Sequence, residues 1–193
     1  MSHVNIYTEQ SPNPNSIKFV VDVPLVENIS FDFPDKESAK LAPIAEALFN
    51  EFGFIQRLFI SSNFITVTKN EETDWFEVNP KISAFIKEWF KDEKPILLEE
   101  IKKEVIKEDL KSQTEETEIE AKIKSILDDY VKPAVESDGG AITFHSFNNG
   151  IVTVLLQGSC SGCPSSTITL KSGIENLLTR MVPEVKEVVA EGV

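Results

Sequence analysis

Apolar residues recur along this chain with two periods, and each period predicts a type of element. Alternation at every second position is typical of a half-buried strand, whereas recurrence every three or four positions is typical of an amphipathic helix. In the first half of the chain, the runs with strand character are 5–8, 17–23, 54–60 and 64–68. The last two flank Ser61-Ser62-Asn63 and predict a hairpin. Helices are expected over 36–52, with Pro43 near the first turn, and from Asn79-Pro80, a cap residue followed by a proline.

The second half of the chain predicts a helix, two strands, a helix and a strand, in that order. The first helix begins with a capping-box pattern, Thr117 with Glu120 three residues later, and Lys132-Pro133 is expected to loosen its end. Its buried side is expected to comprise Ile119, Ile123, Ile126, Leu127 and Tyr130. The strands are expected at 141–147, 151–156 and 185–190, and the second helix at 165–180. The apolar positions of that second helix are Ile168, Leu170, Ile174, Leu177, Leu178 and Met181.

Two glycine-containing turns separate these elements. Asp138-Gly139-Gly140 reverses the chain between the first helix and the first strand, and we interpret it as a structural turn that needs glycine. Asn148-Asn149-Gly150 predicts a hairpin turn with positive φ between the two strands.

The distribution of aromatic residues divides the chain into two domains. Of 13 Phe, only Phe144 and Phe147 lie beyond residue 100, and both tryptophans lie before it. Residues 95–116 are rich in Glu and Lys and contain no glycine, which is typical of a solvated, partly helical linker. The alternative for this segment is a helix that docks on one of the domains. We therefore expect an α+β protein in which two small domains, 1–94 and 117–193, each pack helices on a short sheet.

Charge and hydropathy exclude several classes of partner. The chain has 19 basic and 32 acidic residues, so its net charge is -13. Such a surface repels nucleic acid and anionic lipid, and neither is expected to bind. No segment approaches the length of a membrane span. Residues 1–7 show neither a basic region followed by an apolar stretch nor an Arg-rich presequence, and a cytoplasmic location is expected.

The two cysteines of the chain, Cys160 and Cys163, form a C-x-x-C motif between a predicted strand and a predicted helix. Pro164 suits the first helical turn, where its missing N–H removes no hydrogen bond. Thiols beside a helix N-terminus face free N–H groups, which favour the thiolate. In a reducing compartment, a thiolate pair is typical of a metal site or a redox couple rather than of a structural disulfide.

The number of available ligands favours a site that two chains share. Structural zinc and iron–sulfur clusters usually take four ligands, and one chain offers two thiols and two histidines. His3 lies in the other domain, and His145 is interpreted as a structural residue of a strand. Cys160 and Cys163 from each of two chains would complete a four-thiolate site at a twofold interface. Such a cluster could be released by dissociation of the pair or by ligand exchange, which is a property of a carrier rather than of an enzyme that keeps its cofactor.

Two other interpretations of the motif stay open at this point. Thioredoxin-like dithiol oxidoreductases also place C-x-x-C between a strand and a helix, and Pro183 could stand for the proline that lies beside their dithiol. Against them, the second domain is short and shows no alternating βαβ start. A zinc-clipped adaptor, in which four thiolates join two chains without redox chemistry, uses the same ligands.

Three blocks in the second domain occur in a specific order, and two more lie in the first domain. The three blocks are Tyr130-Val131-Lys132-Pro133 with Asp138-Gly139-Gly140, then 158–166 (GSCSGCPSS), then 169–175 (TLKSGIE). Together they resemble the C-terminal domain of NifU and of the Nfu iron–sulfur carriers. Residues 11–19 (SPNPNSIKF) and 64–69 (FITVTK) resemble the N-terminal domain of Nfu proteins of the mitochondrial type. Departures such as Lys132 in place of arginine, Ala141-Ile142 in place of a more acidic strand start and Asn63 in place of aspartate remove no ligand.

The resemblance implies a protein that binds a [4Fe–4S] cluster between two protomers through Cys160 and Cys163, with [2Fe–2S] as the alternative form. It implies transfer of the cluster to apo iron–sulfur proteins, a donor scaffold that supplies it, and no enzymatic turnover or catalytic residues. The cysteine-free domain 1–94 would help to recognise the partners.

Overall fold

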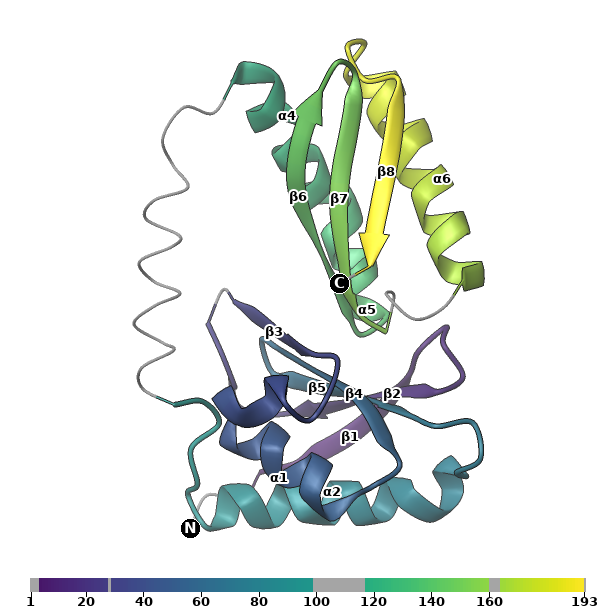
Figure 1. The fold of residues 1–193 in the computed structure, drawn as a ribbon. Coiled ribbons are helices and arrows are strands. Elements are labelled where there is room, and N and C mark those ends of the chain that lie inside the picture. The colour runs from purple at the N-terminus through teal and green to yellow at the C-terminus, as the bar shows by residue number, and fades with distance from the viewer. Residues whose placement is uncertain (1–3, 28, 99–116, 160–163, 193) are drawn as a thin grey trace. The chain divides into compact units, whose positions relative to one another are not determined.

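The computed structural model describes residues 4–27, 29–98, 117–159 and 164–192. Within them the chain forms two compact units, each a sheet with helices packed against it (Figure 1). The α+β class with two domains is therefore confirmed. The predicted linker lies outside the described residues from 99 to 116, so the limits 1–94, 95–116 and 117–193 stay predictions. Over the described ranges, no helix combines the length and the apolar character that crossing a membrane requires.

The first unit is built on a five-stranded antiparallel sheet. Its strands are β1 Ile6–Gln10, β2 Ser16–Val21, β3 Ser30–Phe33, β4 Ile55–Ser61 and β5 Phe64–Lys69, in the order β1-β2-β5-β4-β3. The predicted β4–β5 hairpin is confirmed, with Ser62 at a φ of 44° in its turn. Strand β3 was not predicted, although Phe31 and Phe33 alternate with Ser30 and Asp32 and pack on the core.

The predicted helix 36–52 is in fact two elements, the 3-10 helix η1 Ser38–Leu41 and the α-helix α1 Pro43–Glu51. Ala42 between them is extended, with φ −128° and ψ 105°. A proline ring disfavours the helical conformation of the residue before it, so Pro43 starts a new helix instead of continuing the first. Ile44, Ala45, Leu48 and Phe49 of α1 are buried in the core.

Helix α2 Trp75–Lys91 begins earlier than predicted. Asp74 caps it, because its side chain accepts a hydrogen bond of 2.9 Å from the backbone N–H of Phe76. Pro80 therefore lies inside the helix, where it lacks the N–H that would bond to the carbonyl of Phe76. Trp75 and Val78 pack on the core and stabilise the extra turn before the proline. The expected start at Asn79-Pro80 is wrong for this reason.

The core of the first unit extends beyond residue 94. Leu97, one of the apolar positions in the predicted linker, is 4% exposed and belongs to the same hydrophobic cluster as Ile82 and Ile86 of α2. The start of the acidic segment is thus packed on the first unit.

The second unit has a mixed three-stranded sheet. Its strands are β6 Gly140–Asn148, β7 Ile151–Gly158 and β8 Glu187–Gly192, in the order β6-β7-β8. Strands β6 and β7 are antiparallel and joined by the predicted turn, with Asn149 at φ 53° and Gly150 at φ 88°. Strand β8 is parallel to β7, so helix α6 Pro164–Met181 is the crossover between them.

The helix that precedes β6 is one path made of three elements: α4 Glu118–Ile126, the π-helix η2 Leu127–Val131 and α5 Lys132–Ser137. The capping box of Thr117 and Glu120 is confirmed. In a regular α-helix, a proline ring clashes with the preceding turn. The wider π turn before Pro133 leaves room for the ring, so the helical path continues through Lys132-Pro133. The same turn moves the buried side from Tyr130, which is 61% exposed, to Val131.

Helix α6 packs through the middle of its predicted apolar stripe. Ile174 and Leu178 are buried, and Leu170 and Leu177 pack against the same core. Ile168 is 68% exposed, contrary to expectation. It lies six positions before Ile174, which places it about 120° away around the helix. Met181, the last residue of the helix, is 37% exposed.

Candidate functional site

Cys160 and Cys163, the two site residues that the sequence predicts, lie outside the described residues, as do Ser161 and Gly162 between them. The structure describes the chain on both sides. Strand β7 ends at Gly158, Ser159 follows it, and α6 begins at Pro164. The predicted strand before the cysteine segment and the predicted helix after it are thereby confirmed.

The entrance to the cysteine segment is attached to the Asp138-Gly139-Gly140 turn. The Ser159 hydroxyl donates a hydrogen bond of 2.6 Å to the carbonyl oxygen of Asp138. The Ser159 backbone N–H donates to the carbonyl oxygen of Gly139 at 3.4 Å. Next to them, Gly140 and Gly158 are paired in the β6–β7 ladder. Residues 21 positions apart in sequence thus meet directly before the first cysteine.

The exit from the cysteine segment is a helix that is fixed at its centre. The N-terminal N–H groups of α6 have no partners within the helix, so this end carries a partial positive charge. No acidic residue lies in its first turn, and a thiolate next to it would meet no opposing carboxylate from the helix itself. In the middle of α6, the Glu175 carboxylate accepts a hydrogen bond of 3.0 Å from the backbone N–H of Val188 in β8.

Of the two histidines, the structure describes only His145. His145 is exposed on β6, at the irregular register between Phe144 and Ser146, and His3 lies outside the described residues. Across the parts of the chain that the structure describes, no group of three or more His, Cys, Asp or Glu side chains could hold a metal ion.

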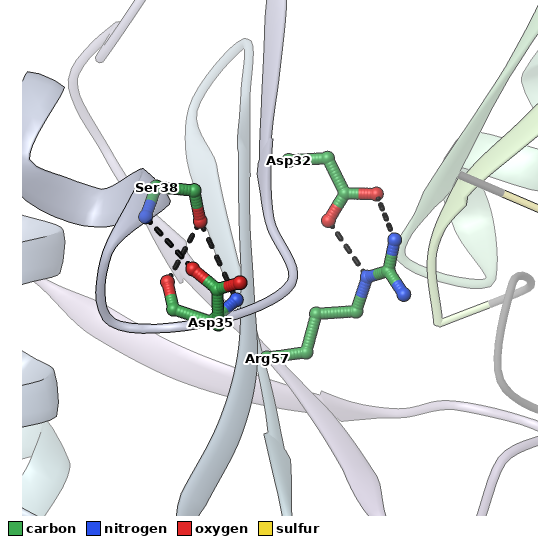
Figure 2. A network of polar contacts seen from close by, with 4 residues as sticks. All are labelled: Asp32, Asp35, Ser38 and Arg57. Carbon is green, nitrogen blue, oxygen red and sulfur yellow. Dashed lines mark hydrogen bonds and ion pairs between the residues drawn. The ribbon is translucent and has the colours of Figure 1, made fainter.

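The first unit contains a polar network that the sequence analysis missed. Arg57 donates from Nε and Nη2 to the two carboxylate oxygens of Asp32, at 2.8 and 2.7 Å, and so connects β4 to β3 (Figure 2). No local pattern could reveal this pair, because 25 residues separate its members.

A second part of the same network lies just before η1. The carboxylate of Asp35 accepts from the backbone N–H of Ser38 at 2.8 Å, and the Ser38 hydroxyl donates to the Asp35 carbonyl at 2.7 Å (Figure 2). The backbone and side-chain hydrogen bonds from Ser38 lower the pKa of Asp35. Asp35 with Ser38 three residues later is a local turn pattern that could have been recognised. The Asp32–Arg57 pair connects two strands, and the Asp35–Ser38 hydrogen bonds hold the turn before η1.

Comparison with known proteins covers both units. Residues 6–93 match the family model "Scaffold protein Nfu/NifU N terminal", and residues 123–189 match the model "NifU-like domain". The human protein "NFU1 iron-sulfur cluster scaffold homolog, mitochondrial" is 42% identical over 184 residues, which are 95% of this chain and 70% of the human one. "NifU-like protein 5, mitochondrial" of Arabidopsis thaliana is 39% identical over 188 residues, or 96% of this chain and 67% of the plant protein.

The solution structure of a NifU-like protein from Saccharomyces cerevisiae aligns with this chain over 50% of this chain and 86% of the yeast chain. Its TM-score is 0.45 and its sequence identity is 19%.

The names of the relatives contradict one expectation from the sequence. The human and Arabidopsis proteins are named mitochondrial, whereas a cytoplasmic location was expected from residues 1–7. A short stretch at one end of a chain is a weak basis for a location, and the cytoplasmic assignment is withdrawn.

Proposed function

Since this chain belongs to the Nfu family of iron–sulfur cluster scaffold proteins, we propose that it carries a [4Fe–4S] cluster as cargo and transfers it to apo-proteins. The cluster would be bound between two protomers by Cys160 and Cys163 of each, with a [2Fe–2S] cluster as the alternative form. A donor scaffold would load the dimer, and apo iron–sulfur proteins would receive the cargo. No catalytic residue takes part.

The observation that carries the proposal is the number of thiols. The chain has two cysteines, and the matched NifU-like region 123–189 contains both of them. A cluster with four thiolate ligands then needs two chains. Thiolate is the form that binds iron, and the N-terminus of α6 directly after Cys163 favours it.

Half a ligand set in each chain supports a carrier rather than an enzyme. A cluster shared by two chains loses half of its thiolate ligands when the dimer dissociates, and thiolates of the acceptor would replace the remaining two by ligand exchange. The cysteine-free domain 1–94 would then recognise the donor and the acceptors, while domain 117–193 binds the cargo.

Anaerobic reconstitution with ferrous iron and sulfide tests the proposal. The wild-type chain should become coloured, elute as a dimer and contain about one cluster for two chains. Cys160→Ser and Cys163→Ser should each remain colourless and monomeric, because a serine hydroxyl does not replace a thiolate as a cluster ligand. Ser172→Ala, which changes an exposed serine on α6, is the matched control and should behave as wild type. Visible absorbance, iron and sulfide analysis and native mass measure these outcomes.

Three results would contradict the proposal in different ways. A wild-type chain that stays colourless and monomeric rules out the shared cluster. A dimer that contains zinc after anaerobic purification and rejects iron indicates the adaptor. A metal-free monomer that cycles between a dithiol and an intramolecular disulfide while reducing a model disulfide indicates the oxidoreductase.

A further inference from the structure

Ser159 is the last described residue before Cys160, and its position is fixed by its neighbours in the fold. Its hydroxyl donates to the Asp138 carbonyl at 2.6 Å, and its N–H donates to the Gly139 carbonyl at 3.4 Å. Both acceptors belong to the turn that connects α5 to β6. The peptide that leads into the cysteine segment is thus attached to a different part of the chain by a hydroxyl and an amide together.

Two glycines make this attachment possible. Gly139 has a φ of 83° and Gly158 a φ of 70°, which side-chain-bearing residues rarely adopt. Gly139 presents its carbonyl to Ser159, and Gly158 directs the chain out of β7. The Asp138-Gly139-Gly140 block and the Gly158-Ser159 step are therefore two halves of one local structure, although the sequence analysis treated the first as a turn alone.

The two ends of the cysteine segment are held by different means. On the exit side, α6 is held by the burial of Ile174 and Leu178 in the core. On the entrance side, the Ser159 hydroxyl donates a hydrogen bond to the turn. A binding segment whose ends are fixed before the ligand arrives loses less conformational entropy on binding and holds the ligand for longer.

We propose that Ser159 is a positioning residue for the cysteine segment, and that its hydroxyl bond to Asp138 slows the release of the bound cluster. The inference rests on the proposed function, because Cys160 must be a ligand for its neighbour to matter in this way. Ser159 itself supplies no ligand: it acts through the backbone that it holds beside Cys160.

Ser159→Ala removes the hydroxyl bond and leaves the backbone N–H in place. The loss of one hydrogen bond of typical net strength should accelerate transfer of iron from the loaded dimer to a chelator by about threefold to tenfold. Ser159→Thr keeps the hydroxyl and should restore most of the slow release. Ser125→Ala is the matched control, because it removes a serine hydrogen bond of 3.3 Å to Asp129 in the same domain. It should release iron at the wild-type rate.

A second measurement uses the full chain without metal and so does not depend on cluster binding. At one fixed pH, alkylation by iodoacetamide followed by peptide mass analysis gives a rate for each cysteine. Ser159→Ala should change the rate of Cys160 relative to Cys163, because it frees only the entrance of the segment. A general loosening of the domain would change both rates together and would also lower the unfolding midpoint.

The outcomes separate the inference from the proposed function. If the wild type holds a cluster and Ser159→Ala releases it at the wild-type rate, the positioning role is wrong and the carrier function stands. If the wild type holds no cluster, the carrier function is wrong. In that case an altered Cys160 to Cys163 ratio in Ser159→Ala still supports the anchor, and an unaltered ratio overturns it.

Discussion

Single side chains determine where the helices of this protein begin. Pro43 separates η1 from α1 by holding Ala42 extended, and Asp74 starts α2 by accepting the N–H of Phe76. At α4, Thr117 and Glu120 each bind the backbone N–H of the other. The first turn of every helix has backbone N–H groups without partners inside the helix. Asp74, Thr117 and Glu120 supply acceptors for such groups, whereas Pro43 has no N–H that needs one.

The capping box predicts a pH dependence. The hydrogen bonds from the backbone N–H and then the hydroxyl of Thr117 lower the pKa of Glu120 from its ordinary value of 4.5. The folded state therefore favours the carboxylate. The stability that Glu120 contributes is fully present above its unfolded pKa and is lost as the pH falls through the lowered folded pKa.

Urea unfolding of the full chain at neutral pH and at a series of acidic pH values measures this effect. Thr117→Ala should lower the free energy of unfolding of the second domain by about 1 kcal/mol at neutral pH. Glu120→Gln should remove part of the acid-dependent loss. Glu118→Gln, which removes a charge from the same turn, serves as the control. A Glu120→Gln chain with the wild-type pH profile would show that the capping carboxylate does not contribute.

At the scale of elements, β8 depends on a side chain from α6. Strand β8 pairs with β7 on one side, and the backbone N–H of Val188, a fully buried residue, is bound by the carboxylate of Glu175. A buried N–H that loses its acceptor destabilises the fold by about 1–3 kcal/mol. Helix α6 therefore supports the edge strand through a hydrogen bond as well as through its apolar stripe.

Substitution of Glu175 tests this support. Glu175→Ala should lower the free energy of unfolding by about 1–3 kcal/mol and speed hydrogen exchange at the Val188 amide, because the buried N–H then loses its acceptor and the edge strand opens more readily. Glu175→Gln keeps an acceptor and should lose less. Glu191→Ala, at an exposed position of β8, should have little effect on either quantity. Equal losses from Glu175→Ala and Glu191→Ala would mean that the contact does not stabilise β8.

The order of elements in the second domain could be predicted because its periods are regular and its turns carry Gly139 and Gly150. What could not be predicted are features that depend on contacts distant in sequence or on a change of helical period. The π turn at Leu127–Val131 is one example: a 3.6-residue period places Tyr130 inside, whereas the wider turn places Val131 there. Strand β3 is another, because four residues are too few for alternation to be decisive.

At the candidate site, too, features set by residues close in sequence could be predicted, and contacts between residues distant in sequence could not. Cys160 and Cys163 are separated by only two residues, so a local pattern predicts them as a pair of ligands. The contact of Ser159 with Asp138 spans 21 positions, and no pattern along the chain shows that these residues meet. The family resemblance included both blocks, but only coordinates show that they form one structure.

At the scale of the whole molecule, each domain is stabilised by its own core. Among the described residues, the buried cluster of the first unit comes from β2 to Leu97, and that of the second comes from α4 to β8, with no member in common. A domain with its own core can fold when its neighbour is removed. Binding of the cargo and recognition of partners can then reside in different domains, as proposed for 117–193 and 1–94.

Deletion of residues 1–94 tests this division of labour. The remaining chain keeps both cysteines, Ser159 and the whole second core, so it should bind as much cluster for each pair of chains as the full protein. Its transfer of cluster to apo [4Fe–4S] proteins should be slower for at least some acceptors, because a docking contact of about 1.4 kcal/mol changes the rate about tenfold. Full-length Cys160→Ser, which has the first domain but should bind no cluster, is the converse control. Unchanged transfer to every acceptor would show that the first domain does not recognise them, while failure of the deleted chain to bind a cluster would show that the second domain needs the first.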